Sequence, residues 1–160
     1  MKIKLFSGSL LFALTIGSAV LLTSCDKDDD DGNNNAVMYN ISGDASGAQE
    51  VPAVTTGATG TLTGTYNTGT NQLTYNINWT GLSDVATVAH FHGPASVGEV
   101  ADPVVDLNIT TNGIDGNITG TATLHDSLEA DLINGRIYYN VHTALNPAGE
   151  IRGQVVATEQ

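Results

Sequence analysis

The sequence has one cysteine, few basic residues and few aromatic ones, and each shortage excludes a class of protein. Cys25 is the only cysteine among 160 residues, so neither an intramolecular disulfide nor a multi-cysteine metal site can form. Seventeen acidic residues against five basic ones give a net charge of −12. This charge argues against binding to nucleic acid and against electrostatic docking on anionic lipid, because both need Lys and Arg. Only 6% of the residues are aromatic and 14% are charged, while 18 are glycine, so the composition favours an all-β domain rich in turns.

The sequence also lacks the common catalytic motifs. It contains no Gly-x-Ser-x-Gly, no Walker motif, no Cys-x-x-Cys and no His-Glu-x-x-His. Paired carboxylates could hydrolyse glycosides, but a sequence does not give the separation that this chemistry requires. The acidic residues considered for that role are Glu50, Glu99, Asp102, Asp106 and Glu150. We therefore expect a protein that is not an enzyme.

The first 24 residues have the pattern of a bacterial lipoprotein signal peptide. Two lysines precede an apolar run from Leu5 to Leu22, which is short for a transmembrane helix. The run ends at Leu22-Thr23-Ser24-Cys25, which resembles the lipobox. In that pattern residues 1–24 are removed and Cys25 is acylated, and several acyl chains together give a stable membrane anchor. An uncleaved signal anchor is the alternative.

Residues 25–35 are predicted to be the lipidated Cys25 and an acidic tether. The segment from Asp26 to Asn35 has no apolar side chain and therefore nothing to bury. It does not fit a calcium-binding EF-hand loop, because Asp31 stands where glycine is required. An acidic run after the lipidated cysteine resembles the surface-export signals of Bacteroidota lipoproteins, whereas an Asp directly after it can cause inner-membrane retention in enteric bacteria. We expect a lipid anchor in the Gram-negative cell envelope, with the outer membrane favoured and the leaflet left open.

Residues 36–160 show the alternation of apolar and polar residues that is typical of half-buried strands. Leu73, Tyr75, Ile77 and Trp79 form the clearest run, and we expect all four to face the core. Eight strands are expected, around residues 37–41, 62–66, 73–79, 86–92, 105–109, 118–124, 137–141 and 151–155. Eight short antiparallel strands in a domain of this size fit a Greek-key β-sandwich.

One segment breaks the alternation and predicts a short helix of about two turns. Asp126 is expected to cap its start, Leu128 and Leu132 share one face, and Gly135 ends it. His125 lies directly before the helix and has no partner at a suitable spacing. We therefore expect His125 at the surface.

Three segments together resemble the CHRD domain, which is named after chordin. They are Gly47-Ala48-Gln49-Glu50-Val51-Pro52, Ala89-His90-Phe91-His92-Gly93-Pro94-Ala95, and residues 139–154, which contain Tyr139-Asn140-Val141-His142-Thr143. The resemblance covers about residues 39–156 and departs at Ala148, where the family often has a second glycine. It implies an immunoglobulin-like or superoxide-dismutase-like sandwich, a secreted or surface location and no established enzymatic activity. We therefore predict a binding or structural module, whose protein or glycan partner the sequence does not identify.

Three histidines form a candidate metal site. His90 and His92 are two residues apart in an expected strand, so both imidazoles lie on one face, and His142 lies in another expected strand. If the three converge, they offer copper or zinc three neutral imidazoles and leave one position open. The pattern also resembles three copper ligands of copper/zinc superoxide dismutase. Residues 93–110 contain no histidine to act as the bridging ligand, and dismutase activity is not expected.

A structural role for the same histidines is the interpretation that we favour from the sequence. Hydrogen bonds from the imidazoles would hold residues 93–102 against the sheet, and no cofactor would be needed. Arg152 is also predicted to be structural. We expect it to form a bidentate ion pair with Glu50, because the two motifs that contain them are expected on adjacent strands.

Overall fold

The computed structural model describes residues 36–110 and 113–160. The predictions for the signal peptide, for lipidated Cys25 and for the acidic tether therefore lie outside the described residues. Within the described ranges, no helix is long and apolar enough to cross a membrane.

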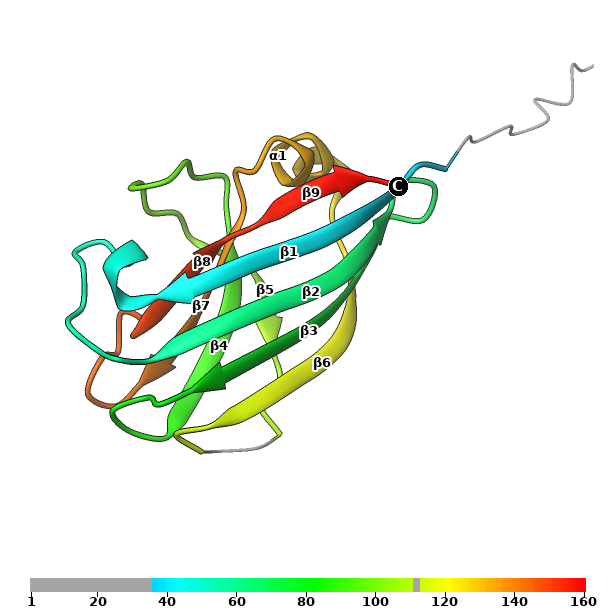
Figure 1. The fold of residues 1–160 in the computed structure, drawn as a ribbon. Helices are drawn as coiled ribbons and strands as arrows, with labels where there is room; N and C mark the ends of the chain where they lie inside the picture. Colours follow the sequence, from blue (N-terminus) through cyan, green and yellow to red (C-terminus); the bar gives the residue numbers. More distant parts are fainter. Residues whose placement is uncertain (1–35, 111–112) are drawn as a thin grey trace, which may run out of the picture. The chain divides into compact units, whose positions relative to one another are not determined.

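In the described part of the chain, nine antiparallel strands form one sheet, and the predicted all-β class is confirmed (Figure 1). They are β1 (Met38–Ser46), β2 (Thr59–Asn67), β3 (Gln72–Thr80), β4 (Ala86–His92), β5 (Pro103–Leu107), β6 (Gly116–Thr123), β7 (Tyr138–Thr143), β8 (Ile151–Gln154) and β9 (Val156–Glu159). The strand predicted at 151–155 is β8, and β9 is a ninth strand that the sequence did not predict. After β8 has paired with β7, buried Val155 leads into β9, which pairs with β1.

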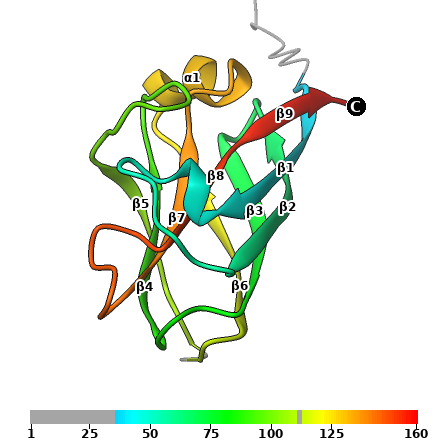
Figure 2. The same cartoon turned by 60° about the vertical axis from the view of Figure 1, so that its left-hand side comes forward.

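The strands are hydrogen-bonded in the order β5-β4-β7-β8-β1-β2-β3-β6, and β9 pairs with β1. In two views, β1, β2, β3 and β6 run side by side as one layer, while β4, β5 and β7 form a second layer facing it (Figures 1 and 2). β8 joins the layers, because it pairs with β7 on one side and with β1 on the other. The sandwich is therefore one sheet that curls over on itself, and three connections cross between its layers.

The core lies between the layers and receives the inward face of each strand. Leu73 and Ile77 are 0% exposed, and Trp79 is 3% exposed while its Nε1 donates to the Gly113 carbonyl at 3.2 Å. Tyr75 is half-buried and packs edge-on against Phe91 of the other layer, with ring centroids 5.6 Å apart. The predicted inward face of this strand is confirmed.

Strand β7 is buried on both faces, and this property positions the candidate site. Tyr139 and Val141 are 0% exposed and point into the core. The opposite face carries Tyr138, Asn140 and His142, and these are also buried, at 4%, 2% and 7% exposed. A polar face that is covered in this way must find hydrogen-bond partners in the protein.

The predicted short helix is present, but its cap differs from the prediction. The helical elements are η1 (Gly47–Gln49), η2 (Asp126–Leu128) and α1 (Glu129–Ile133). His125 is the N-cap of η2, where its side chain accepts a hydrogen bond from the Ser127 N–H, so the expected cap at Asp126 is wrong. The Asp126 carboxylate instead accepts from the Asn71 amide at 2.6 Å. Gly135, at φ +68, follows the helix as predicted, and His125 is exposed as predicted.

A buried carboxylate ties several connections together at one end of the sheet. Glu150 is 0% exposed and accepts hydrogen bonds from Ser83 N–H and Oγ at 2.8 Å, and from the hydroxyls of Thr56 and Thr143 at 2.9 Å. Burial by itself would raise the pKa of Glu150, but these hydrogen bonds outweigh it and hold the pKa below its usual value. Its oxygens are committed to structural contacts, so Glu150 is not a catalytic acid.

Candidate metal centre

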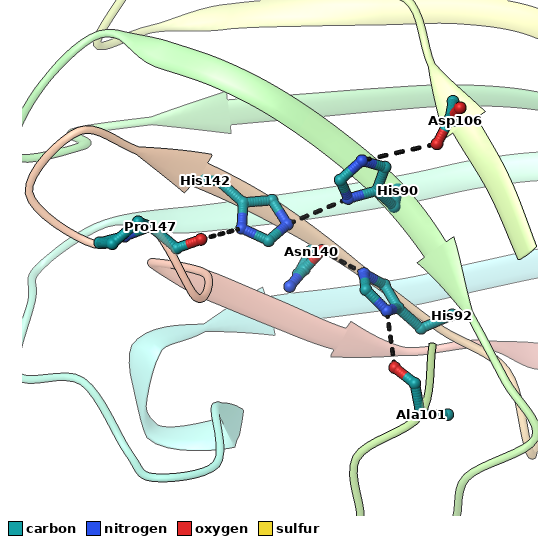
Figure 3. Close-up of polar contacts among 7 residues, drawn as sticks. All are labelled: His90, His92, Ala101, Asp106, Asn140, His142 and Pro147. Carbon is teal, nitrogen blue, oxygen red and sulfur yellow. Dashed lines mark hydrogen bonds and ion pairs between the residues drawn. The ribbon is translucent and has the colours of Figure 1, made fainter. Parts of the chain in front are cut away.

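Three histidines converge on the outer face of β4 and β7 (Figure 3). β4 carries His90 and His92, while β7 carries His142, and the register places His90 opposite Asn140. One ring nitrogen from each histidine lies within 4.8 Å of the other two. The structure thus brings together the three side chains that the sequence nominated.

In each imidazole, one ring nitrogen points away from the other two histidines and contacts an acceptor. We call this atom the outer nitrogen and the other ring nitrogen, which faces the cluster, the inner nitrogen. His92 Nδ1 is 2.9 Å from the carbonyl of Ala101, and His142 Nδ1 is 3.0 Å from the carbonyl of Pro147. His90 Nε2 lies 3.6 Å from a carboxylate oxygen of Asp106 on β5. His92 therefore makes the predicted contact with residues 93–102, whereas His142 holds the connection between β7 and β8.

The two carbonyl contacts set the tautomers of His92 and His142 when their imidazoles are neutral. Since a carbonyl only accepts, Nδ1 of each of these rings carries the hydrogen and Nε2 presents a lone pair. His90 Nε2 is too far from Asp106 for a hydrogen bond, so His90 can carry its hydrogen on Nδ1 and donate it to His142 Nε2 at 3.2 Å. His92 Nε2, in contrast, faces the amide oxygen of Asn140 at 3.0 Å. Two acceptors at such a distance need a proton or a metal cation between them.

Burial makes a proton a poor occupant at neutral pH. It lowers the pKa of His92 and of His142, against the raising effect of their carbonyl contacts with Ala101 and Pro147. The charge of a protonated His90 lowers both values further. His92 and His142 are therefore neutral at pH 7, which is the form that binds metals.

Tyr138 and Arg152 fix the ring of His92. The imidazole stacks on Tyr138 with ring centroids 4.7 Å apart and planes 3° apart. The Arg152 guanidinium lies 3.6 Å from the centroid of the same Tyr138 ring, a cation–π contact. This stack restricts rotation of His92 and so helps to keep its Nε2 directed at the cluster.

Arg152 is structural, as predicted, but its partners differ from the prediction. Although only 2% exposed, it donates to the carbonyls of Glu99 at 2.6 Å and Ser96 at 3.3 Å, and to Gln154 Oε1 at 3.0 Å. Of the ion pairs found among the described residues, none joins Arg152 to Glu50, so the predicted bidentate pair is wrong. The guanidinium points instead to the 93–102 loop, whose carbonyls need donors.

Glu50 is buried next to the candidate centre, behind Asn140. It is 8% exposed, and within the described part of the chain its Oε1 has no hydrogen-bond partner. Burial raises the pKa of Glu50 to about 7, although the charge of Arg152 and the Asn140 amide both lower it. Gly149, at φ +127, leaves room for both groups, since a Cβ there would lie 2.3 Å from Glu50 Oε1 and 2.7 Å from Asn140 Nδ2.

Sequence reasoning did not nominate Asn140 as part of this site. The signal that could have found it is its position, because it alternates with core residues Tyr139 and Val141 and lies two residues before His142 on the same face. A buried amide on this face of β7 must make polar contacts inside the protein.

Comparison with known proteins places the centre in a family. A family model described as the CHRD domain matches residues 41–155. The chain belongs to the CHRD family. Among curated proteins, chordin of Xenopus laevis is similar, at 38% identity over 88 residues, which cover 52% of this chain and 9% of chordin. The chain therefore spans only a small part of that relative. No solved structure matches.

The predicted resemblance is thus confirmed, and the CHRD match contains the whole candidate centre. Glu50, His90, His92, Asn140 and His142 all lie within residues 41–155. The centre is built by the strands and loops of the CHRD domain itself, not by a segment added to it.

Proposed function

We propose that this CHRD domain is a non-enzymatic module that binds copper or zinc through His90, His92 and His142. The observation that supports the proposal most strongly is the orientation of the imidazoles. Each outer nitrogen faces an acceptor, and each inner nitrogen faces the cluster. Carbonyl and carboxylate acceptors behind the histidines are the usual surroundings of metal-binding imidazoles.

The distances require a movement on binding. Copper and zinc bind imidazole nitrogens at about 2.0–2.1 Å, so neighbouring ligands of a tetrahedral ion lie about 3.3 Å apart. One nitrogen of each ring lies within 4.8 Å of the other two, so the longest separation must shrink by up to about 1.5 Å. His90 is the ring with room to move, because its side chain is 15% exposed whereas the other two rings are more deeply buried.

The surroundings favour a cation. Asp106, behind His90, has a 91% exposed side chain and opens the site to solvent on that side. The whole chain has a net charge of −12, so its field attracts positive ions.

The same proposal places the domain on the bacterial envelope. Support comes from the sequence: a signal-type segment, a lipobox ending at Cys25 and an acidic tether precede the CHRD domain. Under this proposal the lipid anchor inserts into the membrane. The metal site is then exposed to the compartment that contains the folded domain.

Calorimetric titration of the metal-free purified protein with Cu²⁺ and Zn²⁺ tests the metal proposal. We expect one ion per chain, and loss of binding in His90→Ala, the variant of the least buried ring. His125→Ala removes an exposed imidazole and should bind as the wild type does. If the wild type takes up neither ion at micromolar concentration, the histidines only make structural hydrogen bonds and the domain acts through another surface.

A further inference from the structure

We propose that Asn140 Oδ1 is the fourth ligand of this centre, and that buried Glu50 behind it makes the site select a divalent ion over a monovalent one. This inference rests on the proposed metal binding and adds the remaining ligand and the charge preference. Figure 3 shows Asn140 between His142 and His92, and its amide oxygen lies 3.0 Å from His92 Nε2.

The geometry supports a fourth ligand at Asn140. With bonds of about 2.0–2.1 Å, neighbouring ligands of a tetrahedral metal lie about 3.3 Å apart. Two contacts in the cluster are close to this length, at 3.2 Å for His90 with His142 and 3.0 Å for His92 with Asn140. The four atoms thus form two pairs, each with the spacing that a shared cation would impose.

The surroundings of Asn140 fix the orientation of its amide. Its Nδ2 is 3.5 Å from the Ala148 carbonyl and lies beside the Glu50 carboxylate, next to Gly149. Both neighbours accept hydrogen bonds, so Nδ2 belongs on that side and Oδ1 faces His92. Since His92 gives its hydrogen to Ala101, Oδ1 receives none from the imidazole. At 2% exposure, Asn140 also has little access to solvent.

The carboxylate of Glu50 places a negative charge next to the Asn140 amide. Among the described groups, Glu50 Oε1 is the one buried side-chain oxygen or nitrogen with no hydrogen-bond partner, which is costly unless the charge serves an interaction. A carboxylate next to Nδ2 polarises the amide and increases the negative charge on Oδ1. Asp106 lies 3.6 Å behind His90 but has a 91% exposed side chain, so solvent screens its charge.

Charge balance then favours a divalent ion. His90, His92, His142 and Asn140 are all neutral ligands, and Glu50 is the buried carboxylate behind them. The attraction of ionised Glu50 for a doubly charged ion is twice its attraction for Cu⁺ at the same distance. We therefore expect Zn²⁺ to gain more from Glu50 than Cu⁺ does.

Three variants test the inference. Asn140→Leu keeps the approximate shape of the side chain but removes its ligand atom, and Glu50→Gln removes the charge. Glu159→Gln removes the same charge from the exposed end of β9 and is the matched control. We expect Zn²⁺ affinity to fall tenfold to 100-fold in Asn140→Leu and about tenfold in Glu50→Gln, the range usual for residues behind a metal ligand, and to stay unchanged in Glu159→Gln.

Two further measurements separate ligation from a purely structural role. In the wild type, the side-chain amide signal of Asn140 in NMR spectra should shift on addition of Zn²⁺, and this readout needs no variant to fold. Competition with a Cu⁺ chelator should show a smaller loss for Cu⁺ than for Zn²⁺ in Glu50→Gln. An unmoved Asn140 signal in Zn²⁺-loaded protein would overturn the fourth ligand, and equal losses for both ions would overturn the charge preference. A wild type that binds no metal would instead overturn the proposed function.

Discussion

His92 Nε2 and Asn140 Oδ1 face each other 3.0 Å apart, although His92 Nδ1 already contacts the Ala101 carbonyl at 2.9 Å. With the hydrogen of the neutral ring committed to Ala101, two acceptors meet where Asn140 is only 2% exposed. The metal proposal explains this arrangement. The contact between His90 and His142 is explained equally well by a hydrogen bond from His90 Nδ1 to His142 Nε2.

Metal binding should depend on pH in a window set by the buried imidazoles. Because burial lowers the pKa of His92 and His142 below the ordinary value of 6.5, both remain neutral at and above that pH. Zn²⁺ affinity should be nearly constant from pH 8 to about 7 and should fall below about 6.5, as protons begin to compete for the ring nitrogens. Calorimetric titrations at several pH values measure this. An affinity that falls steeply between pH 8 and 7 would show that the rings have raised pKa values instead.

Glu50 should make the metal-free protein less stable as pH rises. Its folded-state pKa of about 7 lies above the model value of 4.5, so between these values the folded state binds more protons than the unfolded state. Stability conferred by the protonated group is present below about pH 4.5 and is lost as pH rises through about 7. The effect is at most about 3 kcal/mol, reduced by the solvent that reaches the site.

Urea unfolding of the metal-free wild type and of Glu50→Gln, at pH 5 and at pH 8, checks this sign. The variant should gain stability relative to the wild type at the higher pH. If the wild type gains relative to the variant on going from pH 5 to pH 8, the Glu50 pKa is lowered and a close partner for its charge exists.

Trp79→Ala should destabilise the domain by about 3–5 kcal/mol, because a large aromatic side chain that is 3% exposed would leave a cavity in the core. Chemical denaturation measures the loss. The exposed neighbour on the same strand is the control, and Asn78→Ala should change stability by less than about 0.5 kcal/mol. A loss under about 1 kcal/mol for Trp79→Ala would contradict the assignment of this face to the core.

Cys25→Ser should abolish lipid attachment, because the chain has no other thiol. Cells that express the wild type or the variant can be labelled with a clickable palmitate, and the protein then isolated and assayed for label. Label is expected on the wild type alone. Equal labelling of both would contradict the lipoprotein proposal.

Alternation and spacing along the chain were enough to predict eight of the nine strands in the described residues and to nominate the three histidines. A strand has a period of two residues, so Leu73 to Trp79 and His90 with His92 could each be assigned to a face from the sequence alone. The convergence of His142 with them was predicted conditionally, since it depended on β4 and β7 being neighbours.

The contacts that complete the site could not be predicted, because they join residues far apart in sequence. Arg152 and Glu50 have opposite charges and were paired because their motifs were expected on adjacent strands, but loop carbonyls at Ser96 and Glu99 lie closer to the guanidinium. The tautomers of the histidines depend in the same way on the carbonyls of Ala101 and Pro147. Such contacts follow from how loops fold back over β7, which no local pattern encodes.

Thermal unfolding of the wild type with and without Zn²⁺ and Cu²⁺, at neutral pH, tests the central claim most directly. An ion that binds only the folded state stabilises it by about 2.7 kcal/mol at 100 times its dissociation constant, so the melting temperature should rise by several degrees. His125→Ala should show the same rise, and His142→Ala should show none. A wild-type melting curve that does not change in the presence of micromolar Zn²⁺ or Cu²⁺ would contradict the account and leave the three histidines with a purely structural role.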